Sequence, residues 1–181
     1  MNPASISLPP LRRQRYLLGR AVRQNSRRLL KALVRDGLVV ASVIHCGAHL
    51  GQERHFYERV GARKVVWIEG SQLTFTQLRA SLEAERTAGA LAAEHLAVNA
   101  LLFAEHGREL TLHGFSNEGQ SNSVFHATET FAKRWPGLRE TGQDETAIST
   151  TLDRVADSYA LDGADLLVLD LLGADVLLHS L

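Results

Sequence analysis

One stretch of the sequence decides the fold: it reads LVVASVIHCGAHLG and covers residues 38–51. Its first half, residues 38–44, is short, apolar and rich in β-branched side chains, which is typical of a strand buried on both faces. The turn Gly47-Ala48-His49-Leu50-Gly51 follows, and residues 52–60 then have a polar, helical pattern. The stretch therefore predicts a strand, a tight glycine turn and a helix.

Strand and helix patterns alternate along the rest of the chain. The first predicted elements are a strand at 64–69, a helix with apolar positions 73, 75, 78 and 82, a third strand near 94–98 and a strand at 109–115. A polar loop at 116–123, an irregular or partly helical insertion at 126–143, a short helix at 152–159, a fourth core strand at 164–170 and a helix from 173 follow. This alternation predicts an α/β fold with a mostly parallel sheet, flanking helices and right-handed crossovers.

The N-terminal region differs from the rest in charge. Residues 1–37 carry nine basic residues and one acid, Asp36, although the whole chain balances 20 basic against 20 acidic residues. Apolar residues in 11–34 recur at helical spacing, and Asp36-Gly37 provides a stop. We therefore divide the chain into a basic lead with an amphipathic helix, 1–37, and a folded domain, 38–181.

The basic residues of this lead have two interpretations. A solvated helix face is the one we favour, because runs of charge usually are solvated. Contact with a phosphate-rich membrane or nucleic acid is the alternative. We expect no nucleic-acid partner.

The composition is that of an ordinary globular protein, with 45% apolar and 22% charged residues in 181. A single cysteine, Cys46, excludes a disulfide within the chain and fits a reducing compartment, so we expect a cytoplasmic location. No apolar run approaches the ~20 residues of a membrane-spanning helix. Arginines also interrupt the N-terminus where a secretory signal needs an apolar core.

Two features point to a bound nucleoside. Glycines at 47 and 51 allow a ligand to approach the backbone where a helix begins. Glu69 lies 18 residues after Gly51, at the end of the second predicted strand, where an acid accepts hydrogen bonds from the hydroxyls of an adenosine ribose. The turn lacks the third glycine of the Gly-x-Gly-x-x-Gly pattern that binds pyrophosphate, and there is no phosphate loop. These features favour S-adenosyl-L-methionine over a nicotinamide cofactor.

Five motifs in order resemble those of the FkbM family of methyltransferases. They are Val43–Glu53 as the first motif, Val66–Glu69 as the second strand, Ser116–Ser123 as the Asn/Ser-rich segment, Thr151-Leu152-Asp153, and Leu166–Val176. The resemblance implies a Rossmann-like class I methyltransferase fold with S-adenosyl-L-methionine as the cofactor. It also implies methyl transfer to a hydroxyl of a small-molecule or glycan acceptor, such as a sugar or natural product.

The resemblance assigns roles to individual residues. The residues expected at the cofactor are Gly47, Ala48, His49 and Gly51 at its methionine end, Glu69 at the ribose, and Asn99, Ser116 and Asn117 beside the adenine. Asp170, at the end of the fourth core strand, is expected to face the sulfonium and the acceptor, because ligands bind at the carboxyl ends of parallel strands. Asp170 or His49 is the group expected to accept the proton or orient the acceptor.

The sequence departs from this family pattern at several positions. His45 stands where the family usually has aspartate, Val168 replaces a lysine, and Leu172 replaces a polar residue. We also count about four core strands and one further strand where a complete domain has about seven, and bare sheet edges invite aggregation. We therefore expect a C-terminally truncated version of the fold. The departures motivate one alternative, a non-catalytic remnant that acts as a binding or interaction module; a nicotinamide-dependent oxidoreductase is another.

The spacing of possible metal ligands does not indicate a metal site. His49, His95, His113 and His126 are scattered, without a His-x-x-x-His pattern, a cysteine pair or an acid cluster. We therefore predict that the protein holds no metal.

Overall fold

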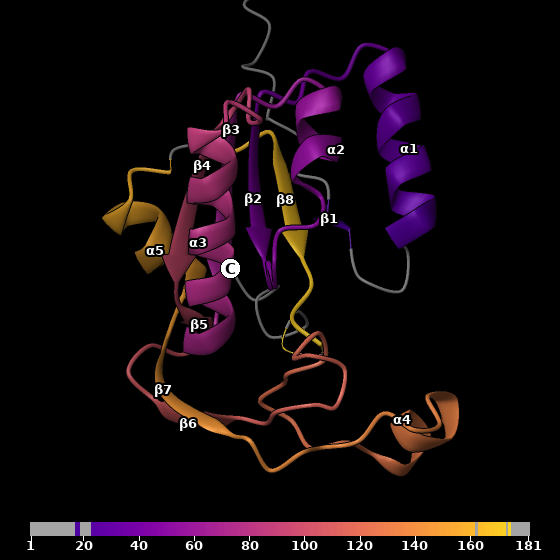
Figure 1. The fold of residues 1–181 in the computed structure, drawn as a ribbon, viewed down its shortest axis with the longest axis vertical. Coiled ribbons are helices and arrows are strands. Elements are labelled where there is room, and N and C mark those ends of the chain that lie inside the picture. The colour runs from indigo at the N-terminus through magenta and orange to yellow at the C-terminus, as the bar shows by residue number, and fades with distance from the viewer. Residues whose placement is uncertain (1–16, 19–22, 162, 173, 175–181) are drawn as a thin grey trace, which may run out of the picture.

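A computed structural model describes residues 17–18, 23–161, 163–172 and 174, and its centre is a parallel sheet (Figure 1). Four strands make up the body of this sheet, and a two-residue strand pairs with the outer side of β8. In spatial order the strands are β1 (Leu17–Leu18), β8 (Leu166–Leu169), β2 (Ser42–Cys46), β3 (Lys64–Glu69) and β4 (Glu94–Asn99). Every neighbouring pair is parallel. The expected α/β fold with a parallel sheet is confirmed.

Side chains alternate between the two faces of this sheet and pack into two apolar clusters. Val43 and Trp67 belong to one cluster, which helices α1, α2 and α3 cover, whereas Ile44 and Ile68 belong to the other, which α5 covers (Figure 1). The bounds of these helices are α1 (Arg23–Arg35), α2 (Arg54–Arg59), α3 (Gln72–Thr87) and α5 (Leu152–Ser158). Because both faces are covered, the sequences of the central strands are nearly continuously apolar.

Hydroxyl side chains cap the N-termini of two of these helices. Ser71 caps α3 by accepting a hydrogen bond from the Thr74 N–H at 3.1 Å, and Thr151 caps α5 in the same way. Helix α1 packs on the sheet, since Leu30 is buried in the first cluster and Val34 contacts it. The basic helix is therefore part of the packed body over Arg23–Arg35. Of the rest of the predicted helical stretch, residues 17–18 form β1, and residues 11–16 and 19–22 lie outside the described residues.

A second, smaller sheet extends from the end of β4. Its order is β5 (Leu101–Leu102), β7 (Glu145–Thr150) and β6 (Glu109–Leu112), with β7 parallel to β5 and antiparallel to β6. Helix α4 (Glu129–Arg134) lies in the insertion between β6 and β7, away from the main sheet (Figure 1). Strand β7 was not predicted, because only Ser149 of its six residues is buried and Ile148 reaches 59% exposure.

The first core strand lies further along the chain than predicted. The predicted strand covered 38–44, but pairing begins at Ser42, and Val39 is 74% exposed. The Asp165 carboxylate explains this start, because its Oδ2 accepts hydrogen bonds from the N–H groups of Ala41 and Ser42, both at 3.0 Å. Apart from Ala174, the predicted final helix from 173 lies outside the described residues. Among the described helices, none has the length and apolar character that crossing a membrane requires.

Candidate functional site

The most promising site lies between β2 and β8, where the chain switches from adding strands on one side of β2 to adding them on the other. From β2 the chain proceeds to β3 and β4 on one side of the sheet, whereas β8 pairs with β2 on the other side. Gly47 follows β2 and Asp170 follows β8, and the Asp170 N–H donates to the Cys46 carbonyl at 2.9 Å. In open α/β sheets such a reversal leaves a crevice at the carboxyl ends of the strands, which is where ligands bind.

The two glycines of the turn have different structural roles. Gly47 has φ +78°, and a Cβ atom there would overlap the carbonyl of Asp170, so only glycine allows the two strand ends to approach. Gly51 has φ +63°, and a Cβ atom there would lie 3.0 Å from Leu78 in the core. Gly47 therefore faces the crevice, and Gly51 allows the turn to pack on α3.

Four N–H groups of the turn are engaged within the protein. Those of Gly47 and Ala48 both donate to the Ile68 carbonyl, at 2.9 and 3.1 Å. That of Gly51 donates to the Ala48 carbonyl at 2.9 Å. The His49 N–H donates to Glu69 Oε2 at 2.7 Å. These four donors are thus committed to holding the turn, and they do not form a cradle for phosphate oxygens.

Glu69 is a buried carboxylate at the edge of the crevice, with only 8% of the residue exposed. Its Oε2 accepts from the His49 N–H, and its Oε1 accepts from the Ser71 N–H at 2.9 Å. Burial raises the pKa of the Glu69 carboxyl, and the two N–H donors oppose that rise only in part. Each carboxylate oxygen keeps the capacity to accept a second hydrogen bond, so a ligand hydroxyl has acceptors here.

The His49 ring connects the glycine turn to the polar loop at 116–123. Its Nδ1 lies 2.7 Å from Gln52 Nε2, which can only donate, and its Nε2 lies 2.9 Å from the Glu118 carbonyl, which can only accept. A neutral ring with its proton on Nε2 satisfies both partners. His49 itself has φ +48°, so the backbone is strained to place the ring there.

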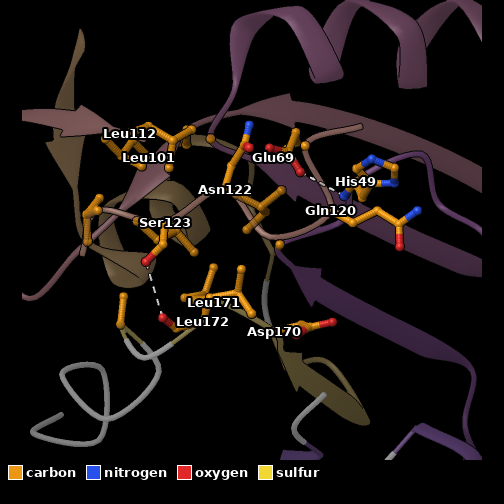
Figure 2. Close-up of a pocket in the computed structure, with 18 residues that line it drawn as sticks. His49, Glu69, Leu101, Leu112, Gln120, Asn122, Ser123, Asp170, Leu171 and Leu172 are labelled. Carbon is orange, nitrogen blue, oxygen red and sulfur yellow. Dashed lines mark hydrogen bonds between the residues drawn. The ribbon is translucent and has the colours of Figure 1, made fainter. Parts of the chain in front are cut away.

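These groups border a partly open crevice with a free volume of about 60 Å³, which is smaller than the roughly 300–1,000 Å³ of most small-molecule sites. Figure 2 shows it between the strand ends and the loop. Most of the wall is apolar. The polar side chains on it are His49, Glu69, Gln120, Asn122, Ser123 and Asp170. Among the described residues that line it there is no lysine or arginine.

The covering segment, residues 119–124, is held by side-chain hydrogen bonds. Asn117 closes the loop by bonding to Ser121 through both ends of its amide, at 2.9 and 3.2 Å. Asn122 Oδ1 accepts from the Phe115 N–H at 3.0 Å. Ser123 Oγ donates to the Leu172 carbonyl at 3.3 Å, which joins the cover to the chain after β8 (Figure 2).

The structure brings four of the predicted site residues together on this cavity: Gly47, His49, Glu69 and Asp170. The other five lie beside it and do not line it. Ala48 is buried and Gly51 packs on the core. Asn99 donates to the Glu69 carbonyl at 2.9 Å and so supports the strand end. Ser116 bonds to the backbone at Gly137 and Arg139, and Asn117 bonds to Ser121, so both fold the loop from outside the cavity.

Several lining residues were missed by the sequence reasoning. Gln120, Asn122 and Ser123 come from the polar loop that was recognised, but from its C-terminal end. Leu101 and Leu112 come from the small sheet, and no local signal connects them with the turn. Only the repeated small polar residues of 116–123 could have suggested the cover.

His45, which stands where the resembling family usually has aspartate, lies away from the cavity. Its residue is 2% exposed, its Nδ1 lies 3.0 Å from the Tyr57 hydroxyl, and its ring packs on Trp67 at a centroid distance of 5.3 Å. The position therefore serves the core beneath α2. Val168 is also a core residue, whereas Leu172 lines the cavity.

Comparison with known proteins adds no family to this geometry. No protein-family model matches the sequence, and a search of curated proteins finds no match. The functional argument thus depends on the site.

Proposed function

We propose that this protein is an S-adenosyl-L-methionine-dependent methyltransferase of the Rossmann-like class I type, similar to the FkbM family. The proposed acceptor is a hydroxyl of a sugar or natural product. The observation that carries the proposal is Glu69, a buried carboxylate at the end of β3 that borders a crevice beside the glycine turn. An acid in this place accepts hydrogen bonds from the ribose hydroxyls of an adenosine group.

The charge of the cavity supports this cofactor over a dinucleotide. Glu69 and Asp170 line it, and the buried Glu53 lies at the start of α2. Four N–H groups of the turn are engaged internally, and no lysine or arginine is among the described residues that line the cavity, so a pyrophosphate would meet two carboxylates without a cationic partner. A sulfonium cofactor carries a positive charge and no phosphate, which suits these walls. The same argument disfavours a nicotinamide cofactor.

Within this proposal, Glu69 holds the ribose and Gly47 allows the cofactor to approach the strand ends. The bound cofactor supplies an electrophilic methyl group. Ile68, Leu101, Leu102 and Leu112 provide apolar walls for a planar base. The protein contributes mainly alignment of the acceptor hydroxyl, which can lower a barrier by ~7–11 kcal/mol.

Of the two candidate bases, the geometry favours Asp170. Both ring nitrogens of His49 are engaged, by Gln52 and by the Glu118 carbonyl, so the ring positions the loop. Asp170 follows β8 and lines the cavity. A carboxylate there can accept the proton of an acceptor hydroxyl, provided that the oxygen comes within hydrogen-bond reach.

Calorimetric titration tests the cofactor assignment. We expect the protein to bind S-adenosylmethionine and S-adenosylhomocysteine, and to give no heat with NAD⁺. Glu69→Gln should weaken both affinities roughly 10- to 100-fold, because a charged acceptor is lost. Glu94→Gln, at the exposed start of β4, is the matched control and should bind like the wild type. No heat with either ligand at millimolar concentration would refute the cofactor assignment.

The alternative of a non-catalytic binding module is favoured by one observation, the burial of His45 in the core. It predicts cofactor binding without methyl transfer to any hydroxyl acceptor. Release of S-adenosylhomocysteine in the presence of a panel of sugars and phenols separates the two. Turnover that disappears in Asp170→Asn, while binding persists, supports the enzyme.

A further inference from the structure

The insertion between β6 and β7 gathers side chains that are far apart in the sequence. His113, His126 and Glu140 each offer one ligand atom, and these atoms all lie within 4.8 Å of one another. The two imidazole rings stack at a centroid distance of 3.8 Å. His126 Nδ1 lies 3.1 Å from Glu140 Oε2. In the part of the chain that the structure describes, this is the one such group of three metal-ligating side chains.

The backbone of the insertion brings these residues together. His113 follows β6 and pairs with Ser123 through two hydrogen bonds, of 2.8 and 3.3 Å. Glu140 lies opposite Phe115 in a second isolated bridge. Spacing along the chain predicted no metal site, because it could not anticipate these two bridges.

Two further contacts orient the possible ligands. Asp144 Oδ2 lies 3.0 Å from His113 Nδ1, and its Oδ1 accepts from the Gly114 N–H at 3.1 Å. Glu140 Oε1 accepts from the Ala127 N–H at 2.6 Å. A carboxylate that fixes the ring of a ligand histidine is the usual outer partner in zinc sites. Asp144 is placed for that role.

From this arrangement we propose that His113, His126 and Glu140 bind a divalent transition-metal ion of the Zn²⁺ type, with Asp144 orienting His113. Two imidazoles and one carboxylate form a known zinc donor set. Zn–N bonds of ~2.0–2.1 Å put tetrahedral ligand atoms roughly 3.4 Å apart, so the ligand atoms need to close by little more than an ångström. The His126 side chain is 73% exposed, which gives the ion access from solvent and leaves room for a water ligand.

Bound metal would connect the two ends of the insertion. His113 and Glu140 flank the segment that contains both the cover of the cavity, residues 119–124, and helix α4. The site would therefore stabilise the cover without touching the cavity wall, because none of its ligands lines the cavity. The proposal does not depend on the cofactor assignment.

Titration of the metal-free full chain with Zn²⁺ tests the site directly. We expect one Zn²⁺ per chain by calorimetry, and visible absorption from protein-bound Co²⁺ in place of Zn²⁺. His126→Ala and Glu140→Gln should each lower the Zn²⁺ affinity at least tenfold and abolish the Co²⁺ spectrum. Zn²⁺ should also raise the Tm of the wild type but of neither variant.

His55→Ala is the matched control. His55 also contacts two carboxylates, those of Glu58 and Glu85, at 3.6 and 3.3 Å, and it belongs to α2 and not to the insertion. We expect this variant to bind Zn²⁺ like the wild type. The proposal is overturned if the wild type binds no Zn²⁺, or if binding survives in His126→Ala and Glu140→Gln.

Discussion

The main parallel sheet and the small β5–β7–β6 sheet are held together by different forces. In β3 every residue after Lys64 is buried, and Val65 and Trp67 are 0% exposed. In β7 only Ser149 is buried, and its hydroxyl donates to the Glu105 carbonyl at 2.6 Å. Apolar burial therefore stabilises the first region, whereas in the second it is limited to Leu101 and Leu102 of β5 and Leu112 of β6, and β7 depends on polar contacts to backbone groups.

The difference explains how the cavity is built. Its base consists of the strand ends Gly47, Glu69 and Asp170, which the buried sheet fixes in place. Its cover consists of Gln120, Asn122 and Ser123, from the polar region. A rigid base and a cover held by individual hydrogen bonds predict that mutations in the two regions will have separable effects.

The largest effect is expected at the strand ends. Gly47→Ala requires a left-handed backbone with a Cβ atom, and that atom would overlap the Asp170 carbonyl. We expect a loss of roughly 3–5 kcal/mol in the free energy of unfolding, measured by urea denaturation. Gly37→Ala is the control, since Gly37 has φ +104° with nothing within 4 Å of the added atom. Equal losses in both variants would show that the close approach is unimportant.

A smaller but clear contrast is expected between the two regions themselves. Leu78→Ala removes a fully buried side chain that contacts the first apolar cluster, and should cost about 3 kcal/mol of unfolding free energy. Ile148→Ala removes an exposed side chain of β7, and should change the free energy of unfolding by less than ~0.5 kcal/mol. A large loss in Ile148→Ala would contradict the claim that β7 depends on polar contacts.

The pH dependence of stability should be traceable to His95, which belongs to the main sheet. Trp67 Nε1 donates to His95 Nδ1 at 3.0 Å, so His95 Nε2 carries the proton and donates to Glu58 at 3.1 Å. Burial lowers the pKa of His95, and the Glu58 carboxylate opposes that shift only in part. Because the unfolded chain takes up the proton first, stability should fall as pH decreases from about 6.5 toward the lower folded pKa.

A non-titrating variant isolates this contribution. His95→Gln can accept from Trp67 and donate to Glu58 without gaining a charge, so its unfolding free energy should vary less with pH between about 7 and 5. His106→Gln, an exposed position in the loop before β6, should keep the wild-type dependence. If His95→Gln also keeps the wild-type pH dependence of the unfolding free energy, a group other than His95 causes that dependence.

The smallest effect on stability, with a distinct effect on binding, is expected in the cover. Asn117→Ala removes the hydrogen bonds that close the loop onto Ser121. We expect a change of about 1 kcal/mol or less in unfolding free energy, but a several-fold loss of affinity for S-adenosylhomocysteine by calorimetry. Gln77→Ala, an exposed amide on α3, should alter neither quantity. An unchanged affinity in Asn117→Ala would show that closure of this loop does not contribute to ligand binding.

The same contrast decides how much could be predicted from the sequence. Strand β3 was predicted with both of its ends correct, because its buried apolar run leaves little choice. The strands β5 and β7 were missed, since β5 is two residues long and β7 exposes Ile148. Short, exposed strands form through distant pairing, and a local pattern does not record it.

The candidate site divides in the same way. Gly47 and Glu69 could be predicted because strand ends and glycine turns follow general rules of parallel sheets. The polar loop was recognised, but Asn117 folds it back so that Gln120 and Asn122 reach the cavity in place of Ser116. The association of His113 with His126 depends on a backbone bridge to Ser123. Such contacts follow from tertiary structure alone.

Hydrogen exchange of the full chain with and without S-adenosylhomocysteine tests the central claim most directly, because it reports on both regions at once. We predict that saturating ligand slows amide exchange in the turn at 47–51 and around Glu69, and also in the cover at 119–124. The protection should disappear in Glu69→Gln at the same ligand concentration. Unchanged exchange in the turn and the cover would contradict the account that these two regions together form an adenosine site.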